Sequence, residues 1–395
     1  MEWTIILTMN QHSSAVKPEQ LQPSWISNQA EVQRLAADLR ELSQVAVDTE
    51  SNSLFAFKEQ VCLLQISSAR EDFLIDTLEL DDLSSLNPLF TSNKIEKVFH
   101  AAEYDILCLK RDYGIEIQTI FDTMQAARIL GIKEVGLGAI LENEFGVIQD
   151  KKYQRANWGL RPLPAYMLDY ACRDTRYLIP LRERLAERMT ERGLMGLAWE
   201  DFARVCKVAL AIGDGREPCW RVAGVQALNP RERAILSELC ALREKQAEKL
   251  NRPLFKIFPN ESLISIAQKN PTTLDDLSDI PGLSPKLVAL YGDDILQAVE
   301  TGKHAAPIPK PAREPRPSVE FLERLDRLKQ WRKETGKKME VESDIILPRD
   351  ILETIAIKNP QEKASLRKIM ADVPWRLEHF GDQIMKIMRI YQEAG

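Results

Sequence analysis

The spacing of apolar positions divides the first part of the chain into strands and helices. Apolar residues at helical spacing predict a helix over 30–42, and the apolar, β-branched run 45–51, VAVDTES, predicts a strand. Further strands are expected at 61–67, 72–76 and 95–100. Strands that come first and helices that mostly follow them predict a mixed sheet covered by helices.

Two helical patterns follow these strands. Residues 102–114 place Ala102, Ile106, Leu109 and Tyr113 on one face, which is typical of a helix packed on a core. The stretch 163–189 predicts one long helix, with a kink at Pro180 because proline lacks the N–H that an interior turn uses.

The second half of the chain contains an internal repeat. Two pairs of segments match at a common offset of 89 residues: LISIAQKNP with LETIAIKNP, starting at 263 and 352, and YGDDIL with FGDQIM, starting at 291 and 380. Long helices are expected to open the two copies, at 230–250 and 319–336. We therefore predict two copies of one all-helical module.

Glycine- and proline-containing stretches at 211–220 and 304–318 separate these regions. They predict the following organisation: a leader over 1–22, an α/β domain over 23–210, a first helical module over 220–303, a linker over 304–317 and a second helical module over 318–395.

The composition is that of a soluble globular protein. The chain has 395 residues, of which 44% are hydrophobic and 28% charged, and its net charge of −6 provides no general attraction for a polyanion. Its six cysteines are scattered, which indicates neither a zinc ribbon nor a disulfide framework and favours a reducing cytoplasm. No apolar run is long enough to span a membrane, and the amino-terminal run lacks the features of a signal peptide.

Five polar residues lie at the ends or on the faces of the predicted strands and helices. Asp48 and Glu50 share one face of a strand, because side chains alternate along it. Tyr170 and Asp174 are four residues apart on a predicted helix, and Asp105 lies in the first turn of another. Taken singly, each also fits a solvent-facing acid, a first-turn acid or an amphipathic core tyrosine. Together they form the series D-x-E, D and Y-x-x-x-D.

This series resembles the motifs of ribonuclease D, a member of the DEDD superfamily of 3′-5′ exonucleases with a tyrosine in the last motif. VAVDTES resembles the first motif, VFHAAEYDILCL the second and YACRDTRYLIPL the third. The repeated modules resemble helicase-and-RNase-D C-terminal (HRDC) domains, and the resemblance extends over nearly all of residues 25–393. It implies an α/β ribonuclease H-like exonuclease domain, a mixed sheet flanked by helices, followed by two all-α HRDC bundles.

The resemblance also implies a reaction. Carboxylates that converge in one cleft repel one another, and Mg²⁺ or Mn²⁺ can compensate them. By the family pattern Asp48 bridges two such ions, Glu50 and Asp174 complete the site on the nucleophile side, and Asp105 supports the second ion. Tyr170 is expected to orient the attacking water. Two ions can then activate water and stabilise the leaving 3′-oxygen.

The implied substrate is RNA with a free 3′ end, such as a tRNA precursor, from which 5′-mononucleotides are released in the cytoplasm without an obligate protein partner. Thr49, His100, Trp158 and Arg161 are candidate substrate-binding residues. His100 also fits a packing role, and Trp158 and Arg161 also fit a cover over the third-motif helix. Ser51 and Asn157 depart from the common family pattern, which leaves the substrate preference open.

Two alternatives remain at this point. The same motifs occur in Werner-type exonucleases that act on DNA, and no residue here reads a 2′-hydroxyl unambiguously. A nucleic-acid-binding scaffold without activity is the third possibility, although it predicts that at least one of the five motif residues is absent.

Overall fold

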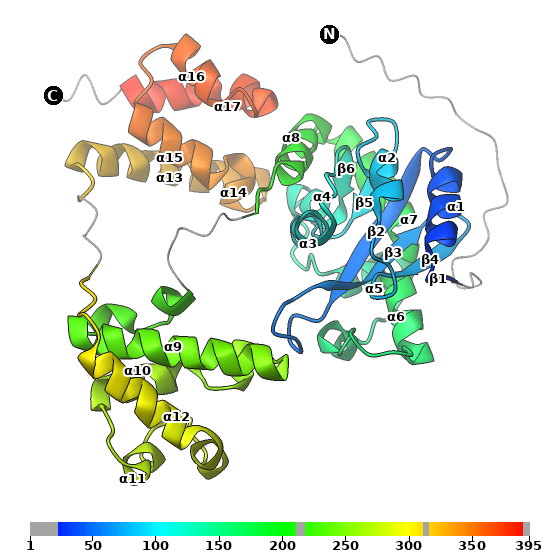
Figure 1. The fold of residues 1–395 in the computed structure, drawn as a ribbon. Helices are drawn as coiled ribbons and strands as arrows, with labels where there is room; N and C mark the ends of the chain where they lie inside the picture. Colours follow the sequence, from blue (N-terminus) through cyan, green and yellow to red (C-terminus); the bar gives the residue numbers. More distant parts are fainter. Residues whose placement is uncertain (1–22, 211–217, 311–315, 390–395) are drawn as a thin grey trace. The chain divides into compact units, whose positions relative to one another are not determined.

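The computed structural model describes residues 23–210, 218–310 and 316–389, which form an α/β domain and two helical bundles (Figure 1). By their contacts the residues group into two compact units. Unit 1 contains the α/β domain, except residues 51–60, together with the second bundle. Unit 2 contains residues 51–60 and the first bundle. The predicted leader over 1–22 lies outside the described residues.

The α/β domain is built on one six-stranded sheet with the order β1-β4-β3-β2-β5-β6. β3 and β4 pair antiparallel, whereas β1 with β4, β2 with β5 and β5 with β6 pair parallel, so the sheet is mixed as predicted. The strands are β1 Ser24–Ile26, β2 Gln44–Ser51, β3 Val61–Ser67, β4 Asp72–Asp76, β5 Glu96–Phe99 and β6 Ile120–Asp122. With three residues each, β1 and β6 are too short to show a strand pattern in the sequence.

Helices cover the sheet and enclose its apolar core. They are α1 Gln29–Leu39, α2 Asn87–Phe90, α3 Glu103–Tyr113, α4 Thr123–Ile129, α5 Leu137–Phe145, α6 Ala165–Arg176, α7 Leu178–Glu191 and α8 Met195–Cys206, with short 3₁₀ helices η2 Ser84–Leu86 and η3 Lys151–Arg155. α6 packs against β3 and β4 around Leu63, Leu74 and Ala171, separately from the main core. This placement brings the third motif next to the sheet.

The long helix expected over 163–189 is two helices, so the predicted kink at Pro180 is wrong. The break falls at Tyr177, between α6 and α7. Pro180 lies in the first turn of α7, where backbone N–H groups have no partner within the helix and a missing N–H costs little. The apolar positions keep helical spacing across the break, although α6 packs in a small cluster and α7 packs on the main core. This continuous spacing concealed the break.

The first bundle contains the long helix expected over 230–250, preceded by two short 3₁₀ helices. Asn229 caps α9 Pro230–Leu250 by accepting the N–H groups of Arg231 and Glu232, and Glu232 completes a capping box. The other elements are η4 Pro218–Arg221, η5 Val225–Ala227, η6 Leu254–Lys256, α10 Asn260–Lys269, α11 Leu274–Ser278 and α12 Pro285–His304.

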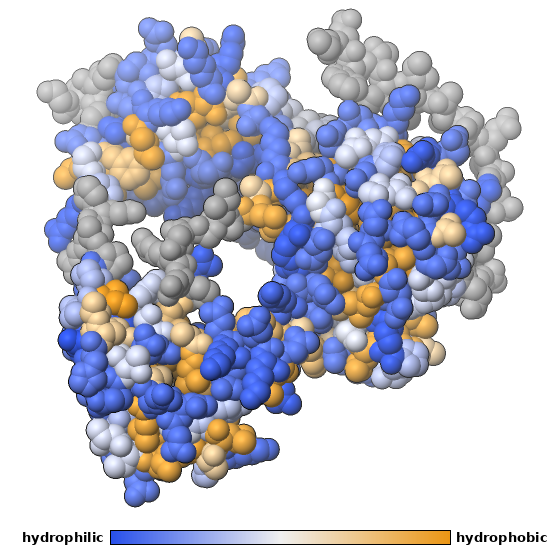
Figure 2. Space-filling model, in the orientation of Figure 1, coloured by the Kyte–Doolittle hydropathy of each residue, from blue (hydrophilic) through white to orange (hydrophobic). Residues whose placement is uncertain are grey.

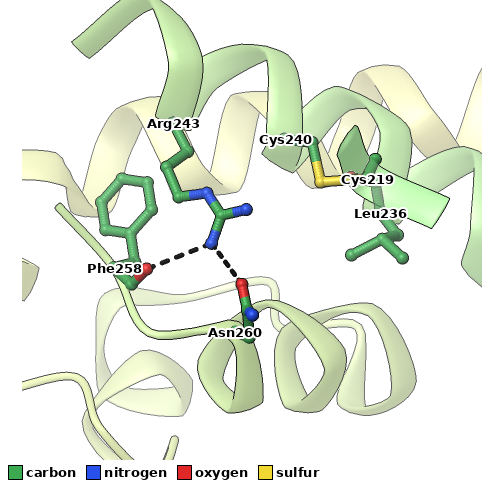
Figure 3. The surroundings of a disulfide bond; sticks show 6 residues. All are labelled: Cys219, Leu236, Cys240, Arg243, Phe258 and Asn260. Carbon is green, nitrogen blue, oxygen red and sulfur yellow. Dashed lines mark hydrogen bonds between the residues drawn. A yellow bond between two sulfur atoms is a disulfide. The ribbon is translucent and has the colours of Figure 1, made fainter. Parts of the chain in front are cut away.

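A disulfide joins Cys219 in η4 to Cys240 in α9 (Figure 3), so the reading of the cysteines as unpaired is wrong for this pair. The two residues are 21 apart in sequence, and no short spacing pattern could show that η4 folds back onto α9. One turn along α9, Arg243 donates to the Asn260 side-chain oxygen at 2.7 Å and to the Phe258 carbonyl at 3.3 Å (Figure 3).

The second bundle repeats this architecture. Its elements are α13 Val319–Met339, α14 Ser343–Ile346, α15 Arg349–Lys358, α16 Lys363–Ile369 and α17 Pro374–Arg389. Positions that match in the repeat are buried in both copies, as in Ile266 and Ile355. The internal repeat therefore corresponds to two structures of one kind.

Within unit 1 the second bundle docks on α8 through a buried arginine. Arg376 is fully buried and donates to Glu200 at 2.9 Å, to Asp201 at 2.9 Å and to the Ile345 carbonyl at 2.8 Å. The neighbouring Trp375 packs over Gly196, where a Cβ would collide with its indole ring. Paired charge and close packing together fix this contact.

The surface is mixed, with hydrophilic residues separating small apolar groups on the face that Figure 2 shows, as on an ordinary folded protein. Among residues 23–210, 218–310 and 316–389, no helix combines the length and the apolar character that crossing a bilayer requires.

Candidate active site

β2 carries the first two acids of the series. Val45 and Val47 in this strand are completely buried, whereas Asp48 and Glu50 near its end are only partly covered. The strand alternation places the two carboxylates on one face. Because β2 lies inside the sheet between β3 and β5, its backbone provides a rigid base for both.

α6 supplies the third motif. Tyr170 and Asp174 are one turn apart and each is 7% exposed. One carboxylate oxygen each from Asp48, Glu50 and Asp174 lie within 4.8 Å of one another. Asp174 thus meets Asp48 and Glu50, which lie more than 120 residues earlier in the sequence, as the motif series predicted.

Asp105 lies beside this cluster and is fixed by the strand that carries two of its members. Its Oδ1 accepts the Thr49 backbone N–H at 3.1 Å and the Thr49 hydroxyl at 2.5 Å. It also lies in the first turn of α3, where the helix dipole favours a negative charge. Thr49 therefore positions Asp105 relative to Asp48 and Glu50.

All four acids have raised pKa values. Burial is the largest cause for each, and repulsion from neighbouring acids adds to it for Asp48 and Glu50, whose pKa values lie well above the usual range. Burial raises the pKa of Asp105 and of Asp174 to about 7. Burial and the nearby acids also raise the pKa of the Tyr170 hydroxyl, so it stays protonated at neutral pH.

This donor set fits hard divalent cations. All the ligands offered are carboxylate oxygens, and their mutual repulsion leaves the cluster short of positive charge. Mg²⁺ and Mn²⁺ prefer such ligands and retain water that a reaction can use. Asp48, Glu50 and Asp174 would form the centre of the metal site.

Gln149 is a member of the site that the sequence did not indicate. Its Nε2 donates to Asp174 Oδ1 at 2.6 Å. It follows α5 in a segment without periodicity, so only its position in the fold reveals the contact. A neutral amide donor here stabilises the ionised form of the acid.

The four candidate substrate-binding residues lie in different surroundings. Thr49 contacts Asp105, and the buried Trp158 places its ring 6.1 Å from that of Tyr170, so both adjoin the cluster. His100 Nδ1 lies 2.9 Å from the Thr123 hydroxyl.

Arg161 has partners away from the acids. Its guanidinium pairs with the buried Asp76 at 2.5 Å and donates to the Cys62 carbonyl at 2.7 Å. The structure gives it an anchoring contact between β3, β4 and the segment before α6, and its contact with substrate stays a prediction.

The α/β domain and both helical bundles match known protein families. Residues 23–190 match the 3′-5′ exonuclease family, and residues 232–299 and 321–388 each match the HRDC domain. This chain carries a 3′-5′ exonuclease domain and two HRDC domains. The exonuclease domain contains the whole acidic cluster, and the HRDC domains are the two helical bundles. The fold class expected from the sequence and its resemblance to ribonuclease D are confirmed.

Curated proteins of eukaryotes match more than half of this chain. The exosome complex exonuclease RRP6 of Saccharomyces cerevisiae is 31% identical over 311 residues, covering 73% of this chain and 42% of RRP6. Exosome complex component 10 of Homo sapiens is 35% identical over 256 residues, covering 62% and 29%. The chain thus spans less than half the length of these curated relatives.

A solved structure matches almost the entire fold. Escherichia coli RNase D, described as an exoribonuclease involved in structured RNA processing, superimposes with a TM-score of 0.67 and 22% identity. The match covers 94% of this chain and all of RNase D. The exonuclease domain and both HRDC domains therefore share their fold with that protein.

Proposed function

We propose that this protein is a 3′-5′ exoribonuclease that uses two divalent metal ions, Mg²⁺ or Mn²⁺, and releases 5′-mononucleotides from RNA 3′ ends. The meeting of Asp48, Glu50 and Asp174 oxygens within 4.8 Å carries this proposal. The names of relatives support it, since RRP6 is called an exonuclease and RNase D an exoribonuclease. A structured RNA such as a tRNA precursor is the proposed substrate.

Each residue of the cluster has a task in this reaction. Asp48, Glu50, Asp105 and Asp174 would hold the ions, which supply an activated water and stabilise the leaving 3′-oxygen when bound. Thr49 keeps Asp105 at the cluster through two hydrogen bonds. The Tyr170 hydroxyl remains protonated, so it orients the attacking water and does not remove its proton.

The test is a time course on an RNA with a 3′ overhang and on the matching DNA, both labelled at the 5′ end. Each is incubated with Mg²⁺, Mn²⁺ or EDTA. Wild type should produce a metal-dependent ladder of one-nucleotide steps on RNA, and Asp48→Asn should produce none. Asp169→Asn is the matched control, because Asp169 lies on α6 but pairs with Arg173 at the surface.

The remaining outcomes separate the alternatives. A stronger ladder on DNA would favour a DNA exonuclease, and binding without cutting under every ion would favour a scaffold. Some relatives are named as exosome components, so activity of the purified chain alone tests the prediction that no obligate protein partner is needed. The cytoplasmic location expected from the sequence stays a prediction.

A further inference from the structure

A series of aromatic rings leads outward from the acidic cluster. Tyr166 and Tyr170 are four residues apart on α6 and so share the face that carries Asp174. Tyr170 is 7% exposed, whereas Tyr166 is 54% exposed. The face therefore changes over one helical turn from the buried catalytic site to an accessible tyrosine ring.

Tyr153 of η3 joins these two rings. Its ring stacks on that of Tyr166, with centroids 5.0 Å apart and an angle of 26° between the planes. It meets Tyr170 edge-on at 5.7 Å, and the Trp158 ring lies 6.1 Å from that of Tyr170. Four rings thus form a continuous path from the buried Trp158 to the exposed Tyr166.

Positive side chains accompany the outer rings. The Lys152 ammonium lies 4.7 Å from the centre of the Tyr153 ring and pairs with the exposed Asp150 carboxylate at 2.5 Å, and Arg155 is exposed on the same short 3₁₀ helix. Asp150 caps this helix by accepting the Lys152 backbone N–H at 3.1 Å, which fixes its start. An exposed tyrosine ring that packs against a helix with two basic side chains suits a ligand that carries both flat bases and phosphates.

We propose that Tyr166 and Tyr153 form a stacking platform for an unpaired base in the 3′ segment of the substrate RNA, close to the nucleotide being removed. The inference rests on the proposed function and adds a binding site to it. Stacking accepts any base, because every base has a π face, but a base within a duplex is not available for it. The platform would therefore select RNA ends that are single-stranded beside the active site.

The test measures binding without cleavage. Asp48→Asn serves as the background, and fluorescence anisotropy with Mg²⁺ follows single-stranded RNA labelled with fluorescein at its 5′ end. A series of these RNAs each lacks one base, at successive positions from the 3′ end. The background protein should bind more weakly, by about five- to a hundredfold, when the missing base is the one that stacks.

Tyr166→Ala, added to this background, should weaken binding of the intact RNA by a similar factor. It should have no further effect on the RNA that already lacks the stacking base, because the same contact is then absent twice. Tyr166→Phe keeps the ring and should restore most of the affinity. Tyr153→Ala should show the same pattern, and thermal melting checks that each variant is folded.

Two results would overturn the platform. One is equal weakening by Tyr166→Ala on every RNA, including each one that lacks a base, and the other is no weakening on any of them. Since Tyr166 is half exposed, its truncation decides the matter even if Tyr153→Ala fails to fold. Failure of the proposed function is seen separately, as absence of cleavage by the wild type with either ion.

Discussion

The two HRDC domains have the same core but differ in how they are attached. Matching positions carry out matching tasks: Arg243 donates to the Phe258 carbonyl in the first domain, and Arg332 donates to the Leu347 carbonyl in the second. In both, a helix ends at an asparagine in the left-handed conformation, at Asn270 and Asn359. Internal packing and helix ends are thus repeated nearly unchanged.

The differences lie on the outside of this common core. Where the second domain has the buried Arg376 that pairs with Glu200 and Asp201, the first has Leu287, which packs on its own domain. The first domain instead has the Cys219–Cys240 disulfide, and its position 240 corresponds to Lys329. A repeated sequence therefore defines the fold, while a few unmatched residues decide what each copy contacts.

The largest effect is expected from Arg376→Ala. It leaves Glu200 and Asp201 buried without their cation, so unit 1 should lose about 3–5 kcal/mol of its free energy of unfolding. Urea unfolding should then show separate transitions for the second HRDC domain and the exonuclease domain. Arg349→Ala, which removes an exposed arginine of the same domain, is the control. An unchanged urea midpoint would mean that Arg376 does not determine the docking.

Removing the disulfide should destabilise unit 2 and leave unit 1 unchanged. For a closed loop of 21 residues, the entropy of the unfolded chain predicts a loss of about 3 kcal/mol. The double variant Cys219→Ala, Cys240→Ala tests this with the fluorescence of Trp220, which is the only tryptophan of unit 2. Dithiothreitol should lower the midpoint of the wild type to that of the double variant and should not affect the variant.

Protonation of His100 in mild acid should lower the stability of unit 1, which contains the second HRDC domain. Burial lowers the pKa of His100 to about 4 in the folded protein, below its usual 6.5. The unfolded chain therefore binds the proton more readily, and the stability that neutral His100 contributes is lost as pH falls from about 6.5 to 4. At pH 5 this loss amounts to about 2 kcal/mol relative to pH 8.

Urea titrations of His100→Gln at pH 8 and pH 5 test this pH dependence. Relative to the wild type, the variant should gain stability on going from pH 8 to pH 5, by up to about 2 kcal/mol. His304→Gln, which removes an exposed histidine, should behave as the wild type does. Equal pH dependence in all three proteins would contradict the assignment to His100.

The smallest effect is expected at the edge of the docking contact. Arg204 pairs with the largely exposed Asp350 at 2.8 Å, and solvent screens such a pair. Arg204→Ala should cost unit 1 about 0.2–1 kcal/mol, far less than Arg376→Ala. A loss as large as that of Arg376→Ala would show that the docking energy is spread along the contact.

Much of the fold could be predicted because local patterns determine it. β3, β4 and α9 begin and end at the predicted residues, since short apolar runs mark the two strands and the Asn229 cap marks the start of the helix. The break at Tyr177 was hidden because the buried positions of the two successive helices continue at helical spacing across it, so the apolar pattern shows no gap.

Part of the site could also be predicted from local patterns. The motif residues have recognisable spacing, and Asp48, Glu50 and Asp174 do meet. Gln149 and Arg376 could not be found, because each contacts an acid that lies elsewhere in the sequence: Gln149 follows α5 in an irregular segment, and Arg376 is a charged residue on the buried face of α17. Such long-range contacts depend on how the elements pack, which no local pattern records.

The contact between Arg376 and Glu200 can form only late in the synthesis of the chain. The two residues are 176 positions apart, so a ribosome working at 5–20 residues per second finishes α8 roughly 10–35 s before it reaches α17. Throughout that interval Glu200 and Asp201 face solvent without their cation, and Trp375 does not yet cover Gly196. In the nascent exonuclease domain, α8 therefore stays uncovered until α17 has been synthesised.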